Sequence, residues 1–281
     1  MSSNINDCFD NTVIDKLYRN VYEIMHPTIS KRNVSNYKII LNEDLAPVRV
    51  FYPEKGFVLK KIMIYVHGSS SITECNFKYA EVCKMIASRT GRLVIAVDYQ
   101  ERFYLDMQKE VNAVVNFLIR ELTSNGILLE DISLMGDDVG ANILMGINCE
   151  KEVKRLYLYP LLTGAYFTDD ELLKDSDFDL LVLHNIRDYF KKCLRYKKDY
   201  KNSLVFPSLD KNYKLVNSLL MVGKADPIEE EVVTFYQEHE HEDSELAVID
   251  FIGHGFLNSA DFEANEEVFR TILDFLDKEE A

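Results

Sequence analysis

The sequence predicts an α/β fold in which a mainly parallel eight-stranded sheet has helices on both faces and carries a small helical cap. The first observation is a series of short apolar runs with the length of strands. The second is that helical periodicity follows most of the later runs. The third is size, because 281 residues with 47% hydrophobic content can bury a large core. The composition is uniform, so we expect a single domain over residues 1–281.

The elements are expected in a fixed order along the chain. Apolar residues recur at helical spacing from Ile14 to Ile24, before Pro27, which predicts an amphipathic first helix. Helical spacing returns most clearly at 107–122 and near the end, at 268–275. Eight β-like runs are found at 36–41, 48–52, 62–66, 93–97, 132–135, 156–159, 218–222 and 246–251.

One long interval, from about residue 161 to 202, interrupts the alternation of strands and helices. It is charged and rich in tyrosine. A stretch of this length is more typical of a functional lid than of a simple connection. We therefore expect a cap or lid built from residues 1–34 and about 161–202.

Charge and composition exclude several classes of partner. The chain has 32 Lys and Arg against 47 Asp and Glu, and a net charge of -15 argues against nucleic acid or an anionic membrane surface. No segment approaches the roughly 18 uninterrupted apolar residues of a membrane span. The five cysteines are odd in number and lack metal-ligand spacing. We expect a cytoplasmic protein without metal or cofactor, for which a homodimer is one option.

The chemistry is expected at the carboxyl ends of the parallel strands, where open α/β sheets bind their ligands. The run 132–135 is followed by Gly136-Asp137-Asp138-Val139-Gly140 and then by a helical segment. This pattern matches the sharp strand-to-helix turn that exposes a nucleophile, except that Asp138 stands where a serine is expected. Two further strand ends supply an acid, Asp226, and a histidine, His254, in the chain order typical of such sites.

Four motifs together resemble the hormone-sensitive-lipase-like branch of the α/β-hydrolases, which contains bacterial esterases and acetyl-hydrolases. The resemblance covers about residues 62–276. The motifs are Gly136-Asp137-Asp138-Val139-Gly140-Ala141-Asn142 beside that branch's G-D-S-A-G-A/G-N, Gly223 with Asp226-Pro227, Gly253-His254-Gly255-Phe256, and His67-Gly68 at the start of H-G-G-G.

This resemblance implies the α/β-hydrolase fold and a site for small acyl esters of the kind that carboxylesterases and lipases hydrolyse. The implied triad is Asp138 at the nucleophile position, His254 and Asp226, on an elbow with Gly136 and Gly140. The implied oxyanion hole consists of backbone N–H groups from Gly68, Ser69, Ser70 and Val139. The expected ligand is small and largely apolar, with an acyl or alkyl group.

The chain departs from the family at two further places. Ser69 and Ser70 replace glycines, and the region after Asp98-Tyr99 lacks the family's D-Y-R-L-A-P-E continuation. Backbone donors survive such replacements, but the conformational freedom of glycine at positive φ does not. We therefore expect an altered oxyanion loop beside an intact acid and histidine.

Asp138 makes ordinary ester hydrolysis difficult. Attack on an ester would form an anhydride, and the tetrahedral intermediate would preferentially expel the aspartate, whose pKa is about 3.9, rather than the much less acidic alcohol. Ester turnover is therefore expected to be weak or absent.

Three other readings of Asp138 stay open at this point. The carboxylate could attack a saturated carbon, as in hydrolases of the epoxide-hydrolase type. It could form a fixed cluster with His254 and Asp226 that raises the imidazole pKa, as in a non-catalytic binder or sensor. It could also be an engineered replacement of a natural serine.

Other polar residues have simpler expected roles. His239-Glu240-His241-Glu242 is expected to be a solvated acidic end rather than a metal site, because side chains two residues apart diverge on a helix. Asp137 and Asp98 are expected to fix loops by hydrogen bonding.

Overall fold

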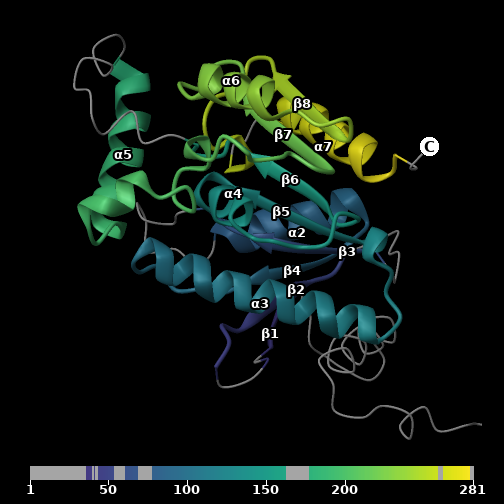
Figure 1. The fold of residues 1–281 in the computed structure, drawn as a ribbon. Coiled ribbons are helices and arrows are strands. Elements are labelled where there is room, and N and C mark those ends of the chain that lie inside the picture. Colours follow the sequence, from purple (N-terminus) through teal and green to yellow (C-terminus); the bar gives the residue numbers. More distant parts are fainter. Residues whose placement is uncertain are drawn as a thin grey trace, which may run out of the picture.

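The computed structural model describes residues 36–39, 41, 44–53, 61–68, 78–162, 177–258 and 262–278. Within these ranges the chain forms an eight-stranded sheet of order β1-β2-β4-β3-β5-β6-β7-β8 (Figure 1). The pairs β1–β2 and β2–β4 are antiparallel and the remaining pairs are parallel. The strands are β1 Asn36–Ile39, β2 Val48–Phe51, β3 Ile62–Val66, β4 Leu93–Val97, β5 Ile132–Asp137, β6 Lys154–Leu158, β7 Ser218–Gly223 and β8 Ser244–Ile249.

The predicted fold class and all eight predicted strands are confirmed, with shifts of a few residues at some ends. The strand β5 continues through Asp137 because Gly136 and Asp137 pair with β6. The strand β8 ends earlier than predicted. Phe251, which was placed at its end, is 95% exposed and has a positive φ of 62°. The predicted strand was too long because the apolar side chain of Phe251 belongs to the loop that follows it.

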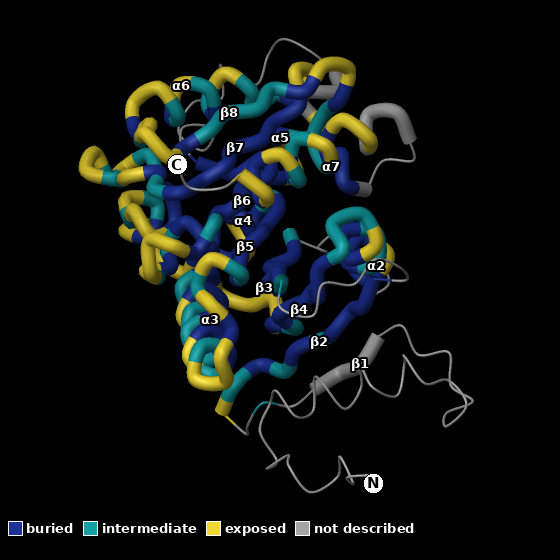
Figure 2. Tube along the Cα trace, turned by 90° about the vertical axis from the view of Figure 1, so that its right-hand side faces the viewer, coloured by how far each residue is buried: buried dark blue, intermediate teal, exposed yellow. Residues whose placement is uncertain are grey.

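Helices cover both faces of the sheet (Figures 1 and 2). On one face α2 and α7 lie together, linked by an ion pair between Arg89 and Glu266. On the other face α3 packs beside α4, and α6 continues this layer over β7. The α-helices are α2 Lys78–Thr90, α3 Tyr104–Ser124, α4 Asp138–Met145, α5 Asp177–Cys193, α6 Glu229–His239 and α7 Phe262–Leu276. Short 3-10 helices are formed by Leu129–Asp131, Lys197–Lys201, Pro207–Leu209 and Phe256–Asn258.

The core lies along the central strands. Every residue of β3, β4 and β5 is buried, as expected for strands that are covered on both faces (Figure 2). The apolar stripe of α3, which the sequence indicated at 107–122, packs onto this layer through buried residues from Met107 to Leu122. None of the described helices is both long and apolar enough to cross a membrane.

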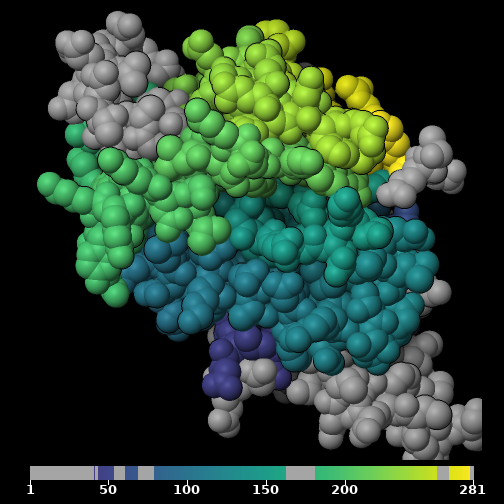
Figure 3. Space-filling view, in the orientation of Figure 1, coloured from purple at the N-terminus to yellow at the C-terminus, as the bar shows by residue number. Residues whose placement is uncertain are grey.

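The interval predicted as a lid contains one long described helix, α5. Its aromatic side chains contact the start of α3: the rings of Phe190 and Tyr104 are 5.9 Å apart, and the Tyr189 hydroxyl lies 3.9 Å from Met107 Sδ. Figure 3 shows this segment in green against the blue start of α3. The predicted helix at 14–24 and the rest of residues 1–34 lie outside the described residues, as do residues 163–176.

Candidate active site

The turn between β5 and α4 has the geometry of a nucleophile elbow. Asp138 has a φ of 51°, in the left-handed region that aspartate and asparagine tolerate better than most side chains. The two flanking glycines are required by close approach of the backbone. A Cβ atom on Gly140 would lie 2.1 Å from the Val66 carbonyl oxygen, and one on Gly136 would lie 2.7 Å from the Ala141 nitrogen. The elbow is therefore fully formed although its central residue is not serine.

Three predicted site residues meet at this elbow. His254 Nδ1 lies 3.0 Å from Asp226 Oδ2, and His254 Nε2 lies 3.6 Å from Asp138 Oδ1. The Asp226 side chain is completely buried, whereas the side chains of His254 and Asp138 are each 15% exposed. The imidazole thus lies between two carboxylates, of which Asp138 is the one that solvent reaches.

The surroundings of His254 favour its protonated form. Burial alone would lower its pKa, but contacts with Asp138 and Asp226, together with their negative charges, outweigh burial and raise the pKa to about 10. The ring consequently holds its proton across the neutral range.

Asp137, the neighbour of the elbow residue, is a buried acceptor for three donors. The Tyr65 hydroxyl donates to Oδ1 at 2.5 Å, the Gly68 amide donates to Oδ1 at 2.9 Å, and the Tyr159 hydroxyl donates to Oδ2 at 3.0 Å. Burial raises the pKa of Asp137, the two tyrosine hydroxyls act in the opposite direction, and the charge of Asp138 raises it further. Asp137 therefore anchors the loop after β3 to the elbow, as a structural carboxylate would.

This anchoring bears on the residues expected in the oxyanion hole. The Gly68 amide is hydrogen-bonded to Asp137, so it is not a free donor toward the elbow. Ser69 and Ser70 lie outside the described residues. Val139 is buried in the first turn of α4, directly after Asp138.

His67 is held in an aromatic stack beside the same loop. Its ring lies between Tyr79 and Tyr99, with centroid distances of 4.6 and 4.4 Å. The Tyr99 hydroxyl donates to the His67 carbonyl oxygen, and the Tyr79 hydroxyl donates to Asp98. Asp98 also accepts from Arg49 at 3.2 Å, which agrees with its expected role in fixing a loop. Burial lowers the pKa of His67.

Two residues near the site have roles that the sequence did not indicate. Tyr159, at the carboxyl end of β6, has a φ of 37° and packs edge-on against His254 with a centroid distance of 5.0 Å. In the sequence, the indication for Tyr159 was its position at the end of an apolar run with the length of a strand. The other, Asn142, is completely buried and joins three segments: it accepts from the Tyr104 hydroxyl and donates to the carbonyl oxygens of Leu161 and Val205. Helix α4 is thereby tied to both chain segments that flank the predicted lid.

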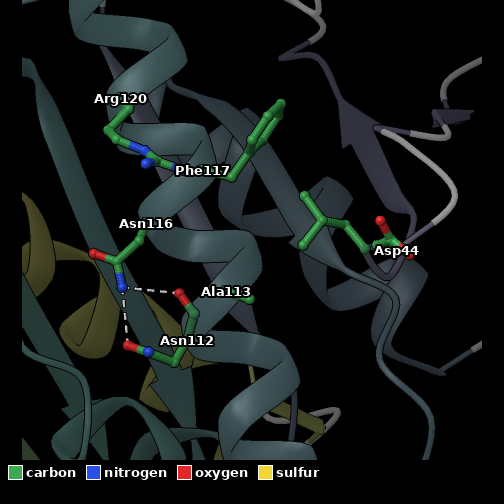
Figure 4. Close-up of a pocket in the computed structure, with 7 residues that line it drawn as sticks. Asp44, Asn112, Ala113, Asn116, Phe117 and Arg120 are labelled. Carbon is green, nitrogen blue, oxygen red and sulfur yellow. Dashed lines mark hydrogen bonds between the residues drawn. The ribbon is translucent and has the colours of Figure 1, made fainter.

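A cavity of about 510 Å³ lies away from the triad, on the outer side of α3. In Figure 4, Phe117 of α3 points toward the segment that carries Asp44. No residue of the triad lines this cavity. The lining residues are Asp44, Leu45, Asn112, Ala113, Asn116, Phe117 and Arg120.

The two histidines of the 239–242 motif lie in different environments because α6 ends at His239, so His241 is not on the helix as the prediction assumed. His239 is buried and its Nδ1 lies 3.2 Å from the Tyr213 carbonyl oxygen, whereas His241 is in the turn that follows α6. In that turn, ligand atoms of His241, Glu242 and Asp243 lie within 4.8 Å of one another. Glu242 and Asp243 are exposed, as expected for a solvated acidic turn.

Several solved structures with the same fold are described as esterases, at low sequence identity. The Francisella virulence factor BioJ matches with a TM-score of 0.72 at 18% identity, over 94% of this chain and 91% of its own. The Pyrobaculum calidifontis esterase matches with a TM-score of 0.68 at 16% identity, over 94% and 92%. EstE1, a thermostable carboxylesterase from a metagenomic library, matches with a TM-score of 0.67 at 17% identity, over 93% and 94%. Identities this low show a shared fold.

No curated protein sequence matches the chain significantly. A family profile described as "alpha/beta hydrolase fold" does match, and it spans residues 63–258, more than half of the chain. That span begins in β3 and ends shortly after His254, so it includes the elbow and both partners of Asp138. The chain belongs to the α/β-hydrolase fold family.

Proposed function

We propose that this protein is a carboxylesterase-like α/β-hydrolase in which the Asp138 site binds a small, largely apolar acyl or alkyl ligand and hydrolyses esters weakly or not at all. The observation that carries the proposal is the ion cluster in which His254 lies between Asp138 and Asp226. In our proposal the chain is one domain, and the segments 1–34 and 161–202 form a cap over this site.

The protonation state of His254 supports this proposal. A histidine in an esterase must accept a proton near neutral pH. Because contacts with Asp138 and Asp226 raise the pKa of His254 to about 10, its imidazole is mostly protonated at pH 7. General-base catalysis contributes roughly 10²- to 10⁴-fold to such reactions, so its loss alone makes turnover slow.

The carboxylate at the nucleophile position supports the proposal as well. A carboxylate that attacks an ester forms an anhydride and is itself the better leaving group, since its pKa of about 3.9 lies far below that of an alcohol. The tetrahedral intermediate therefore returns to the starting ester. The oxyanion hole also lacks one of its expected donors, because the Gly68 amide donates its hydrogen bond to Asp137. In our proposal the remaining donors are backbone N–H groups of Ser69, Ser70 and Val139.

The test compares hydrolysis of p-nitrophenyl acetate and butyrate by the wild type, Asp138→Ser and Asp138→Ser/His254→Ala. We expect Asp138→Ser to gain at least about 100-fold over the wild type, because a serine leaves His254 with one carboxylate and restores its role as a base. The double variant should lose this gain. A wild-type rate equal to that of a catalytically active Asp138→Ser variant would contradict the proposal.

A second candidate is attack by the Asp138 carboxylate on a saturated carbon. In an epoxide this attack breaks the C–O bond, and the released oxygen takes a proton from water; in an alkyl halide it expels the halide ion. The position of His254 Nε2, 3.6 Å from Asp138 Oδ1, favours it. Alkylation would neutralise Asp138 and remove one of the charges that raise the His254 pKa, so the imidazole could then activate water.

This candidate predicts a covalent intermediate. In His254→Gln, which lacks the base for the second step, incubation with 1,2-epoxybutane should add the mass of the epoxide to the peptide that contains Asp138. Absence of this adduct, in protein shown to be folded, would eliminate the candidate and leave the binding proposal intact.

A further inference from the structure

Tyr159 joins two parts of the site that are far apart in the sequence. Its hydroxyl donates to Asp137 Oδ2 at 3.0 Å, and its ring packs edge-on against His254 with a centroid distance of 5.0 Å. The side chain is buried, so both contacts lie inside the protein. Because Asp137 also accepts from the Gly68 amide at 2.9 Å, Tyr159 connects the imidazole to the loop after β3.

The backbone of Tyr159 is held in a conformation that bulky residues rarely adopt. Its φ of 37° lies in the left-handed region, which persists at such a residue only where the surrounding structure enforces it. The Tyr159 amide donates to the Met221 carbonyl oxygen of β7 at 2.7 Å. Asp226 follows the same strand, and its amide donates to the Gly223 carbonyl oxygen at 3.1 Å. The tyrosine is therefore fixed to the strand that positions the acid.

The loop that carries His254 packs on the same tyrosine ring. Phe256 is buried and contacts Tyr159 with a centroid distance of 4.8 Å. The torsion between the Cβ atom and the ring of a histidine has broad preferences, so packing against a fixed neighbour is needed to set the ring plane. That plane determines whether the two nitrogens can lie 3.0 Å from Asp226 and 3.6 Å from Asp138.

We propose that Tyr159 is a positioning residue for His254. Its hydroxyl, fixed on Asp137, holds the tyrosine ring against the imidazole, and the ring nitrogens consequently face Asp138 and Asp226. This inference rests on the proposed function, in which His254 lies between these two carboxylates. Tyr159 acts through His254 and not through contact with a ligand. Without its hydroxyl or its ring, the imidazole turns away from Asp138, the more distant carboxylate, and binds its proton less tightly.

Tyr65 provides the matched control. Its hydroxyl donates to the other oxygen of the same carboxylate, Asp137 Oδ1, at 2.5 Å, and it is as buried as Tyr159. Tyr65 is on β3, and β5 lies between β3 and β6 in the sheet. Tyr65→Phe and Tyr159→Phe therefore remove the same atom from the same acceptor. Among the described rings, it is that of Tyr159, not that of Tyr65, that packs against His254.

The experiment is an NMR titration of ¹⁵N-labelled His254 in the whole chain, for the wild type, Tyr159→Phe, Tyr159→Leu and Tyr65→Phe. The midpoint reports how tightly the carboxylates hold the imidazole proton, which a loss of stability alone does not change. We expect it to fall by at least about 0.3 pH units in Tyr159→Phe and at least about 1 in Tyr159→Leu, or about twofold and tenfold weaker proton binding. Tyr65→Phe should move it by less than about 0.1.

The two Phe variants decide the test even if Tyr159→Leu does not fold. An equal shift in Tyr65→Phe and Tyr159→Phe would show that the effect passes through Asp137 alone, and this would overturn the inference. An unchanged midpoint in Tyr159→Phe would overturn it as well.

Failure of this inference is distinguishable from failure of the proposed function. If wild-type His254 titrates near its ordinary pKa of about 6.5, the ion cluster is absent and both proposals fail. If it titrates near 10 and Tyr159→Phe leaves the midpoint in place, only the positioning role of Tyr159 is wrong.

Discussion

Asp138 Oδ1 lies 3.6 Å from Nε2 of His254, on the ring nitrogen opposite the one that contacts the buried acid. In a serine hydrolase that nitrogen must be free to take a proton. Here it faces a carboxylate, so the histidine is stabilised in the form that cannot act as a base. The glycines of the elbow are in place, and the buried acid keeps its contact with the other ring nitrogen.

The raised pKa of His254 makes stability depend on pH in a defined window. The ordinary pKa of about 6.5 applies to the unfolded chain, and the folded value is about 10. The stabilisation from this group is therefore fully present below about pH 6.5 and is lost as the pH rises through about 10. In urea unfolding from pH 6 to pH 10, the stability difference between wild type and His254→Gln should shrink steadily. A difference that stays constant would show that the two carboxylates do not hold the proton.

Asp137 should matter for stability far more than an exposed carboxylate such as Glu130. Asp137→Ala leaves the Tyr65 hydroxyl, the Tyr159 hydroxyl and the Gly68 amide without their acceptor. Each unsatisfied buried donor costs about 1–3 kcal/mol, so we expect a loss of more than about 3 kcal/mol in denaturant unfolding. Glu130→Ala, at an exposed carboxylate, should change stability by less than about 0.5 kcal/mol. Similar effects of the two substitutions would refute the anchoring role.

Gly140→Ala tests the close approach of the elbow to β3. The new Cβ would lie 2.1 Å from the Val66 carbonyl oxygen, and backbone must move to relieve the clash. Gly126→Ala is the matched control, because Gly126 has a φ of 86° but no atom within 4 Å of the added Cβ. The control should lose about 1–2 kcal/mol from its positive φ alone. Gly140→Ala should lose clearly more in thermal or urea unfolding, and an equal loss would contradict the packing argument.

Asn142 should be essential for joining α4 to the segments that flank the predicted lid. In Asn142→Leu, which has similar volume, the Tyr104 hydroxyl and the carbonyl oxygens of Leu161 and Val205 lose their partner. We expect about 2–4 kcal/mol of destabilisation and faster amide exchange in these segments. In Asn116→Leu the broken bonds are local to α3, so the effect should stay below about 1 kcal/mol. Unchanged exchange in Asn142→Leu would argue against the connection.

The strands could be predicted because buried parallel strands appear in a sequence as uninterrupted apolar runs. The elbow, the acid and the histidine could be predicted from their positions, since Asp138, Asp226 and His254 each come after such a run. The predicted ends of β5 and β8 differ from the observed ends at Asp137 and Ile249. One depends on pairing between Asp137 and Leu158, and the other depends on a loop that exposes Phe251.

The network behind the elbow could not be read from sequence. Tyr65 and Asp137 are 72 residues apart, and neither residue type nor spacing identifies such a pair among sixteen tyrosines. The same holds for Asn142, whose partners lie on three different segments. The hydrogen bond from the Gly68 amide to Asp137 is likewise a consequence of tertiary structure. It changes which backbone N–H groups remain for an oxyanion hole.

The most direct test of the account is an NMR titration of His254 with ¹⁵N-labelled imidazole, in the wild type and in Asp138→Ser. We expect a wild-type ring that stays protonated until about pH 10, and a lower His254 pKa when the serine removes one of the two carboxylates. A wild-type pKa near the ordinary 6.5, unchanged by the substitution, would contradict the ion cluster and leave His254 available as a base.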